Sequence, residues 1–398
     1  MRKLVIGFVV VVLILGAGSA TYFIAKSHSS TTFVSVGTSA QTKTPTSNTK
    51  QPDCPEVLFD TLPLALSDFR AFRPLGFLAP PIHIFGAKHS SFAINLPGEH
   101  VSGKPVHFPG NATVTLITTV YGDQKGYQLT FYPCSQVKSY LFHLGTISER
   151  LLAEVTKDEG TCQEFNFGTS KTKKCELTTK TAVTSGELAG GSDSFGGVDW
   201  GLVDYRFTNT FINPDRYDGD YPHYTTPLNY MKADVKAQLE SKVGSFDGLV
   251  KRTDQPIGGS LLQDIPGTAQ GNWFTGGQSF KTTNDFSPFL ALVHDYIDTK
   301  QPVFSMGKSV NGVSMGLYSF TPTKGGLINQ DFDQVKPGNT YCYEKWLSGT
   351  TKGGLPLSTI AGVLLLHMPD DKTLKVEKQA GPCSAAAQIS ASATTFER

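Results

Sequence analysis

Apolar and polar residues alternate along much of this chain, and the alternation predicts a mainly β protein. The pattern is clearest over residues 112–120 and 127–132, where the two kinds interleave as in a half-buried strand. The glycine-bounded segment 122–126 supplies a turn between these two strands. Further apolar segments predict strands at residues 258–262, 289–296, 313–320, 340–346, 362–367 and 374–377.

Two helices interrupt the strand pattern. The sequence TISE at residues 146–149 has the capping-box pattern, which predicts a short helix over residues 148–155. Thr226 and Pro227 predict the start of a second helix, because a cap and a first-turn proline precede apolar residues that recur every three to four positions. Gly244 is expected to end this helix.

These elements divide the chain into two β domains. We expect an antiparallel first domain over residues 54–225, a connecting helix over 226–244, and a second domain, a β-barrel or sandwich, over 245–385. The combined length is large for a single core and suits two. Residues 386–398 are rich in Ser, Ala and Thr, and we expect them to form a flexible tail.

The first 26 residues predict export from the cytoplasm. Arg2 and Lys3 precede an apolar run that reaches the ~20 residues needed to cross a bilayer. An uncleaved anchor would use the whole run and leave the N-terminus in the cytoplasm, whereas a signal peptide would be cleaved near the small residues 17–20. We favour the single-pass anchor, because Tyr22 and Phe23 prolong the apolar run.

Residues 27–53 are polar and carry almost no apolar side chains, so we expect a disordered tether that holds the folded part outside the cell membrane. The net charge is +1 and charged residues make up only 17% of the chain, which argues against nucleic acid as a partner. The sequence contains no phosphate-binding loop, dinucleotide fingerprint or nucleophile elbow.

All six cysteines follow the apolar N-terminal segment, and an even number in an exported protein favours disulfides. Cys162 and Cys175 flank a predicted hairpin, so we expect them to pair. Two further candidate pairs are Cys342 with Cys383, which share the last third of the chain, and Cys54 with Cys134, which remain. A zinc-binding cysteine cluster is the alternative, but no CxxC spacing occurs.

The order of short motifs between residues 83 and 204 resembles the β-core of lysostaphin-type zinc endopeptidases, which are bacterial cell-wall peptidases. That family carries an HxxxD metal motif, a G-x-P-V strand, a Y-x-H-L segment and a closing H-x-H strand. The matching segments here are HSSFA at residues 89–93, GKPV at 103–106, YLFHL at 140–144 and GVD at 197–199. The resemblance covers about a third of the chain and implies an antiparallel peptidase-like β-core.

The resemblance also implies that the metal site is degenerate. His89 stands at the first ligand, but Ala93 replaces the aspartate, and Gly197 and Asp199 replace both histidines of H-x-H. Only His143 keeps the place of a catalytic histidine. A zinc hydrolase needs three protein ligands and an open position. His89 and Asp199 would supply two of them, and further histidines are available in the first domain at positions 83 and 107.

We therefore expect a non-catalytic, membrane-anchored extracytoplasmic protein that uses this scaffold for binding or envelope assembly and needs no cofactor. Its partner would be a cell-wall peptide or glycan, or an envelope protein. The alternative is an active zinc metalloendopeptidase, or a related cell-envelope hydrolase, with rearranged ligands.

Two groups of residues are candidates for ligand contact. An aromatic groove beside His143 would use Tyr140 and Trp200, and a glycine-rich loop over residues 264–274 would present three side chains. These are Gln270, Asn272 and Trp273. The alternative, which we favour for Phe142 and Trp273, is that the aromatic rings pack in the core.

Overall fold

The structure is a computed structural model, and it describes residues 54–122, 125–167, 170–283, 287–385 and 388–398. The expected anchor and tether, residues 1–53, lie outside the described residues. Within the described ranges, no helix is both long and apolar enough to span a membrane.

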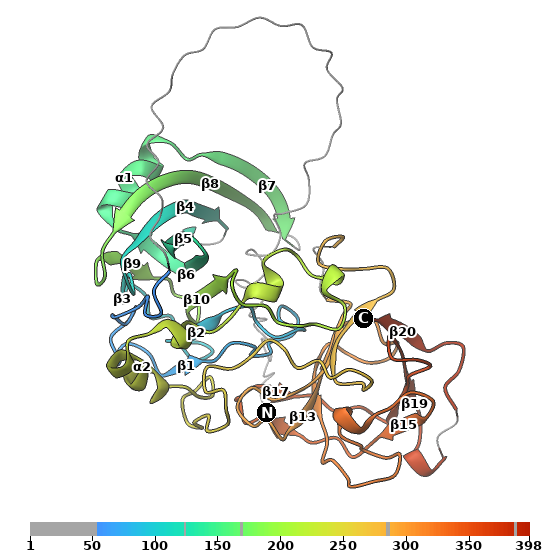
Figure 1. Ribbon diagram of the computed structural model, residues 1–398. Coiled ribbons are helices and arrows are strands. Elements are labelled where there is room, and N and C mark those ends of the chain that lie inside the picture. Colours follow the sequence, from blue (N-terminus) through green and yellow to red (C-terminus); the bar gives the residue numbers. More distant parts are fainter. Residues whose placement is uncertain (1–53, 123–124, 168–169, 284–286, 386–387) are drawn as a thin grey trace, which may run out of the picture.

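The described chain is mainly β and forms two ten-stranded sheets, which lie side by side in Figure 1. The first sheet consists of β1 (Ala71–Arg73), β2 (Ser90–Ala93), β3 (Pro105–His107), β4 (Ala112–Tyr121), β5 (Lys125–Cys134), β6 (Val137–Ile147), β7 (Thr161–Phe167), β8 (Ser170–Val183), β9 (Leu188–Ser192) and β10 (Gly197–Asp204). The main path of this sheet runs β1-β2-β10-β6-β5-β4-β8-β7, and β9 joins β3 to β6. This order places β2, β10 and β6 next to one another.

The two clearest predicted strands are confirmed as β4 and β5, which pair antiparallel across the expected turn. The next strand, β6, continues the meander, and β8 pairs with both β4 and β7. These strands curve over as an open arch in Figure 1. The sheet therefore has one concave face, which its core fills.

The helix predicted over residues 148–155 is confirmed as α1 (Glu149–Lys157), but the capping box is not formed. Ser148 is the N-cap, and its side chain makes no cap hydrogen bond. Thr146 cannot cap the helix, because β6 continues through Ile147 and pairs there with β9. Strand pairing thus replaces the local capping interaction.

The second predicted helix is split into two, the 3₁₀ helix η3 (Pro227–Tyr230) and α2 (Ala233–Glu240). Thr226 does cap the first piece. The N-terminal segment causes the break, because the N–H of Lys232 donates to the carbonyl of Phe59 at 2.8 Å. α2 ends at Glu240, before the predicted Gly244.

The second sheet has the order β15-β18-β19-β20-β11-β12-β13-β14-β17-β16. Its strands are β11 (Gly271–Thr275), β12 (Leu290–His294), β13 (Pro302–Met306), β14 (Gly316–Ser319), β15 (Thr340–Tyr343), β16 (Gly349–Thr350), β17 (Pro356–Leu357), β18 (Val363–His367), β19 (Thr373–Gln379) and β20 (Thr394–Glu397). Short 3₁₀ turns complete the described elements: η1 (Pro214–Arg216), η2 (Tyr221–His223), η4 (Phe332–Gln334) and η5 (Cys383–Ala385).

Two predictions for this half are wrong. Residues 258–262 form a loop, in which Gly259 has a φ of +80° and packs so closely on Leu75 that a Cβ there would lie 2.1 Å from its carbonyl oxygen. The expected flexible tail contains β20, which lies between β19 and β11 and buries Phe396 completely. Pairing on both sides satisfies the backbone polar groups of β20, although its own sequence has a single apolar side chain.

All three expected disulfides are present: Cys54–Cys134, Cys162–Cys175 and Cys342–Cys383. The Cys162–Cys175 bond joins directly opposed residues of the β7–β8 hairpin. The Cys54–Cys134 bond fixes the beginning of the described chain to the end of β5.

An aromatic core lies between the two sheets. Phe85, from the first half of the chain, stacks on Phe289 from the second half with ring centroids 5.3 Å apart. Phe274 packs edge-on against both rings. The two sheets do not exchange strands within the described residues, but they share these buried side chains.

Candidate functional site

The neighbouring strands β2, β10 and β6 bring distant polar residues together. Asp199 lies in β10, where it is opposite Ser91 of β2 on one side and Phe142 of β6 on the other. His89 directly precedes β2, and His143 lies in β6. The antiparallel register therefore places both histidines beside the same aspartate.

His143 occupies a β-bulge with an unusual backbone. Between Leu141 and Leu144, two residues of β6 face a single residue of β5. The φ of His143 is +64°, in the left-handed region that few non-glycine residues adopt. Such a conformation costs about 1–3 kcal/mol and persists where the surrounding structure fixes it.

Two carboxylates hold the His143 ring. Its Nδ1 lies 3.1 Å from Oδ2 of Asp193, and its Nε2 lies 3.4 Å from Oδ2 of Asp199. The other oxygen of Asp199 lies 3.3 Å from Nδ1 of His89. All four side chains are largely buried. They form a continuous chain of alternating carboxylates and imidazoles.

These buried groups shift one another's pKa values. Burial lowers the pKa of His143, but Asp199 and Asp193 outweigh that effect and raise it above its ordinary value. Burial raises the pKa of Asp199, but nearby His89, His143 and Arg73 outweigh it and hold the pKa below its ordinary value. Burial lowers the pKa of His89, and the attraction of Asp199 only partly offsets this. These shifts favour the charged forms of His143 and Asp199 and the neutral form of His89.

His89, His143 and Asp199 form one wall of a cavity of about 190 Å³. Arg73 and His83 also line it, together with Phe77 and Phe246. The ring centroids of His83 and His89 are 5.2 Å apart. His107, by contrast, lies in β3 and does not line this cavity.

Arg73 has no place among the residues singled out from the sequence, although it contributes the cavity's permanent charge. Its Nη2 donates to Oγ of Ser91 at 2.8 Å, and its guanidinium lies 4.1 Å from the centre of the Phe77 ring. A signal was present, because Arg73 is the lone charge in the apolar segment AFRPLGF. An arginine in such a segment must find partners inside the fold.

The residues around His89 and Asp199 do not fit a preformed three-ligand zinc site. The strand residues Ala93 and Gly197, which pair with each other across β2 and β10, carry no side chain that could act as a third ligand. A Cβ at Gly197 would lie 1.9 Å from the carbonyl oxygen of Phe92, so no side chain fits there without a shift of the backbone.

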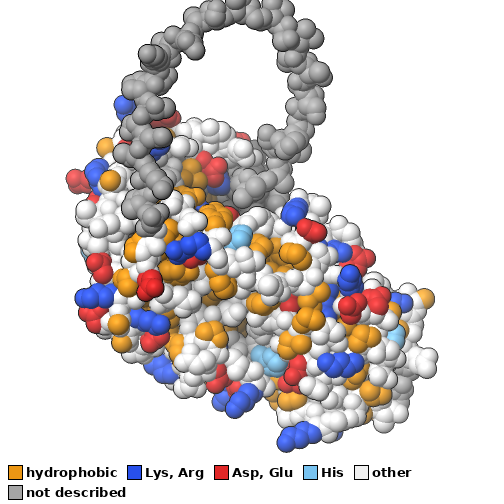
Figure 2. Space-filling view, in the orientation of Figure 1, with side chains coloured by type: hydrophobic (Ala, Val, Ile, Leu, Met, Phe, Trp, Pro, Cys, Tyr) orange, Lys and Arg blue, Asp and Glu red, His pale blue; other side chains and the backbone are white. Residues whose placement is uncertain are grey.

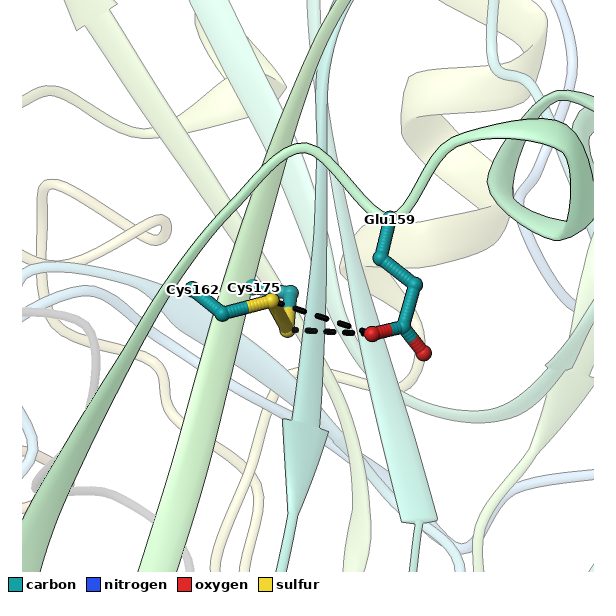
Figure 3. Close-up of side chains that lie close together, drawn as sticks. All are labelled: Glu159, Cys162 and Cys175. Carbon is teal, nitrogen blue, oxygen red and sulfur yellow. Dashed lines mark hydrogen bonds between the residues drawn. A yellow bond between two sulfur atoms is a disulfide. The ribbon is translucent and has the colours of Figure 1, made fainter.

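Elsewhere in the described chain, one group of three potential ligands has its donor atoms within 4.8 Å of one another: Glu159, Cys162 and Cys175 (Figure 3). Both sulfurs of this group are joined in a disulfide with an S–S distance of 2.05 Å. They are therefore not available as thiolate ligands, and the group is not a metal site while the disulfide is intact.

The expected aromatic groove is not exposed. Tyr140 and Phe142 are buried, and Trp200 is completely inaccessible. The Trp200 ring stacks on Phe92, and its Nε1 donates to Oγ of Ser139 at 3.0 Å. Because these rings fill the core, they offer no open aromatic surface beside His143, and the interpretation of Phe142 as a core residue is confirmed.

The three candidate side chains of the expected ligand-binding loop are also buried. Trp273 lies in β11 with no exposed surface, and its Nε1 donates to the carbonyl of Ala269 at 2.8 Å. Asn272 donates to the hydroxyl of Tyr217 inside the core. Gln270 lines a second cavity of about 380 Å³, which is distinct from the histidine cluster.

Comparisons with protein-family models, with curated proteins and with solved structures found no significant match to this chain, so the site is interpreted from its own residues.

Proposed function

We propose that this protein is a non-catalytic binding protein of the cell envelope, exported and anchored in the cell membrane by residues 1–26. In this proposal the degenerate peptidase-like core binds a cell-wall peptide or glycan, or assembles with an envelope protein. The observation that carries this proposal is the arrangement of His89, Asp199 and His143. The three side chains contact one another and do not converge on an open position for a metal ion.

Catalytic zinc requires three ligands and a free position for water. Here both oxygens of Asp199 already face imidazole nitrogens, so binding a metal would disrupt the contacts of this buried carboxylate with His143 and His89. Gly197 has no room for a side chain that could replace them. The contacts among these side chains therefore suit a structural role beside a ligand-binding cavity better than they suit hydrolysis.

The proposed location and partners draw on two further observations. Three disulfides favour an oxidising compartment, because such bonds are rare in the cytosol. On the face shown in Figure 2, positive and negative side chains of the described residues are interspersed, without a broad patch of one sign. Such a surface does not favour nucleic acid.

One observation favours a second candidate, a zinc endopeptidase with rearranged ligands. The Nε2 atom of His83 is buried without a hydrogen-bond partner, and its ring lies against that of His89. After side-chain movement, His83 would supply the third ligand beside His89 and Asp199.

Metal content separates the two functions. The full-length chain is purified in detergent without chelators, incubated with zinc, passed through a desalting column and analysed for zinc per chain. We expect a substoichiometric amount and no cleavage of cell-wall peptides. One zinc per chain that is lost in His83→Ala, together with peptide cleavage, would establish the peptidase instead.

A further inference from the structure

Two residues that line the 190 Å³ cavity each have a buried side-chain nitrogen without a hydrogen-bond partner. These nitrogens are Nε of Arg73 and Nε2 of His83. Buried polar groups in folded proteins are almost always paired with protein, water or ligand. Two unpaired nitrogens at one cavity therefore point to a missing acceptor.

Arg73 also lacks an ion-pair partner. Among the described residues, no carboxylate lies within 4.0 Å of its guanidinium nitrogens. Its contacts are the hydroxyl of Ser91 and the rings of Phe77 and Phe246, whose centres lie 4.1 Å and 5.1 Å from its central carbon. Asp199, which also lines the cavity, attracts Arg73 electrostatically, but it lies beyond ion-pair distance and both of its oxygens face histidines. A water molecule could accept from Arg73, but it would not balance the charge.

His83 is suited to donate a hydrogen bond beside this charge. A neutral imidazole carries one N–H, and in His83 this hydrogen can reside on the unpartnered Nε2. With the hydrogen on Nε2, both unpaired nitrogens are donors. The acceptor they require is an anion or a strongly polar oxygen.

We propose that this cavity binds a carboxylate, which accepts hydrogen bonds from Nε of Arg73 and Nε2 of His83. A carboxylate matches the planar donor face of a guanidinium better than other small anions of this size. The cavity has room for roughly six water molecules. That volume suits a small organic acid or the last residue of a peptide. The inference rests on the proposed binding function and narrows its ligand to a carboxylate.

The test uses calorimetric titration of the full-length chain with N-acetyl-Ala-Ala, with the same peptide as its C-terminal amide, and with propionate. We expect the free acid to bind at least tenfold more tightly than the amide. Propionate distinguishes the source of the carboxylate: equal affinity for propionate indicates a small acid, and much weaker binding indicates a peptide terminus.

Variants assign the binding to this cavity. Arg73→Gln and His83→Gln should each weaken binding of the acid about tenfold or more, while Arg70→Gln and His100→Gln should stay within about twofold. Arg70 is a matched control because it directly precedes β1 and pairs with Glu99 at the surface, and His100 is exposed. If Arg73→Gln does not fold, the comparison of acid with amide on the unaltered protein decides.

Equal binding of acid and amide would overturn the inference, as would unchanged binding in both cavity variants or no binding of either peptide. None of these results bears on zinc content or peptide cleavage. A failure of the carboxylate inference therefore remains distinct from a failure of the proposed non-catalytic function.

Discussion

Ala93 and Gly197 face each other directly across β2 and β10, and neither carries a side chain that could bind a metal. The backbone of β2 has closed over Gly197, so that the carbonyl of Phe92 occupies the space of a side chain. The packing of β2 on β10 at this point therefore depends on the absence of a side chain at position 197.

Substitution of Gly197 tests this packing. Gly197→Ala should destabilise the protein by about 2 kcal/mol or more, because a Cβ would lie 1.9 Å from the Phe92 carbonyl and the strands would have to separate. The adjacent Gly196 is a matched control, since a Cβ there meets nothing within 4 Å. Gly196→Ala should change stability by less than about 0.5 kcal/mol in urea unfolding. Equal stabilities of the two variants would show that β10 accommodates a side chain at position 197.

Removal of His143 should be more costly than the loss of one neutral hydrogen bond. His143→Ala leaves two buried carboxylates, Asp193 and Asp199, without the imidazolium that faces both. We expect a loss of about 3 kcal/mol in the free energy of unfolding, measured by urea denaturation, and no change in zinc content. The half-buried His107→Ala serves as the control. A fully stable His143→Ala protein that has lost a hydrolytic activity would instead assign the histidine to catalysis.

The His143 ion pair should make stability depend on pH. The folded-state pKa of His143 is raised, so its stabilisation is fully present below the unfolded value of about 6.5 and is lost as the pH rises through the folded value. The stability difference between the protein and His143→Gln should therefore shrink from about pH 6.5 upward. Thermal unfolding at several pH values measures it. A difference that grows with pH would mean that the ring is neutral in the folded protein.

Removal of a disulfide should lower the free energy of unfolding, and the loss should increase with the number of residues that the disulfide spans. The Cys54–Cys134 bond spans 80 residues and the Cys162–Cys175 bond spans 13. Loop-closure entropy then predicts losses of roughly 4.5 kcal/mol and 3 kcal/mol for the respective double serine variants. Urea unfolding of both variants gives the comparison. A larger loss at Cys162–Cys175 would show that native contacts near that hairpin outweigh the chain entropy.

Local patterns predicted the parts of the fold that depend on neighbours in sequence. The strands β4 and β5 followed from alternation on either side of a turn, and Cys162 and Cys175 could be paired because one hairpin contains both. The break before α2 could not be predicted in this way, because it results from a hydrogen bond to Phe59, far earlier in the chain.

The candidate site was likewise predictable only in part from the sequence. The motif order placed His143 and Asp199 in the first half of the chain, and the sheet brings them together. Arg73 was missed because its relation to the cavity exists only after β1 pairs with β2. The left-handed backbone conformation of His143 could not be predicted from the sequence either, since it arises from the register of β6 against β5.

The position of β20 has a consequence for how the second sheet assembles. Its residue Phe396 pairs with Thr275 in β11, and its other edge pairs with β19. Without β20, the sheet order separates into a group containing β15, β18 and β19 and a group running from β11 to β16. The two strands that β20 joins lie far apart in the sequence, since β11 begins at Gly271 and β19 at Thr373. Removal of the last four residues, which form most of β20, is therefore expected to leave both groups without their shared strand and to open the second sheet.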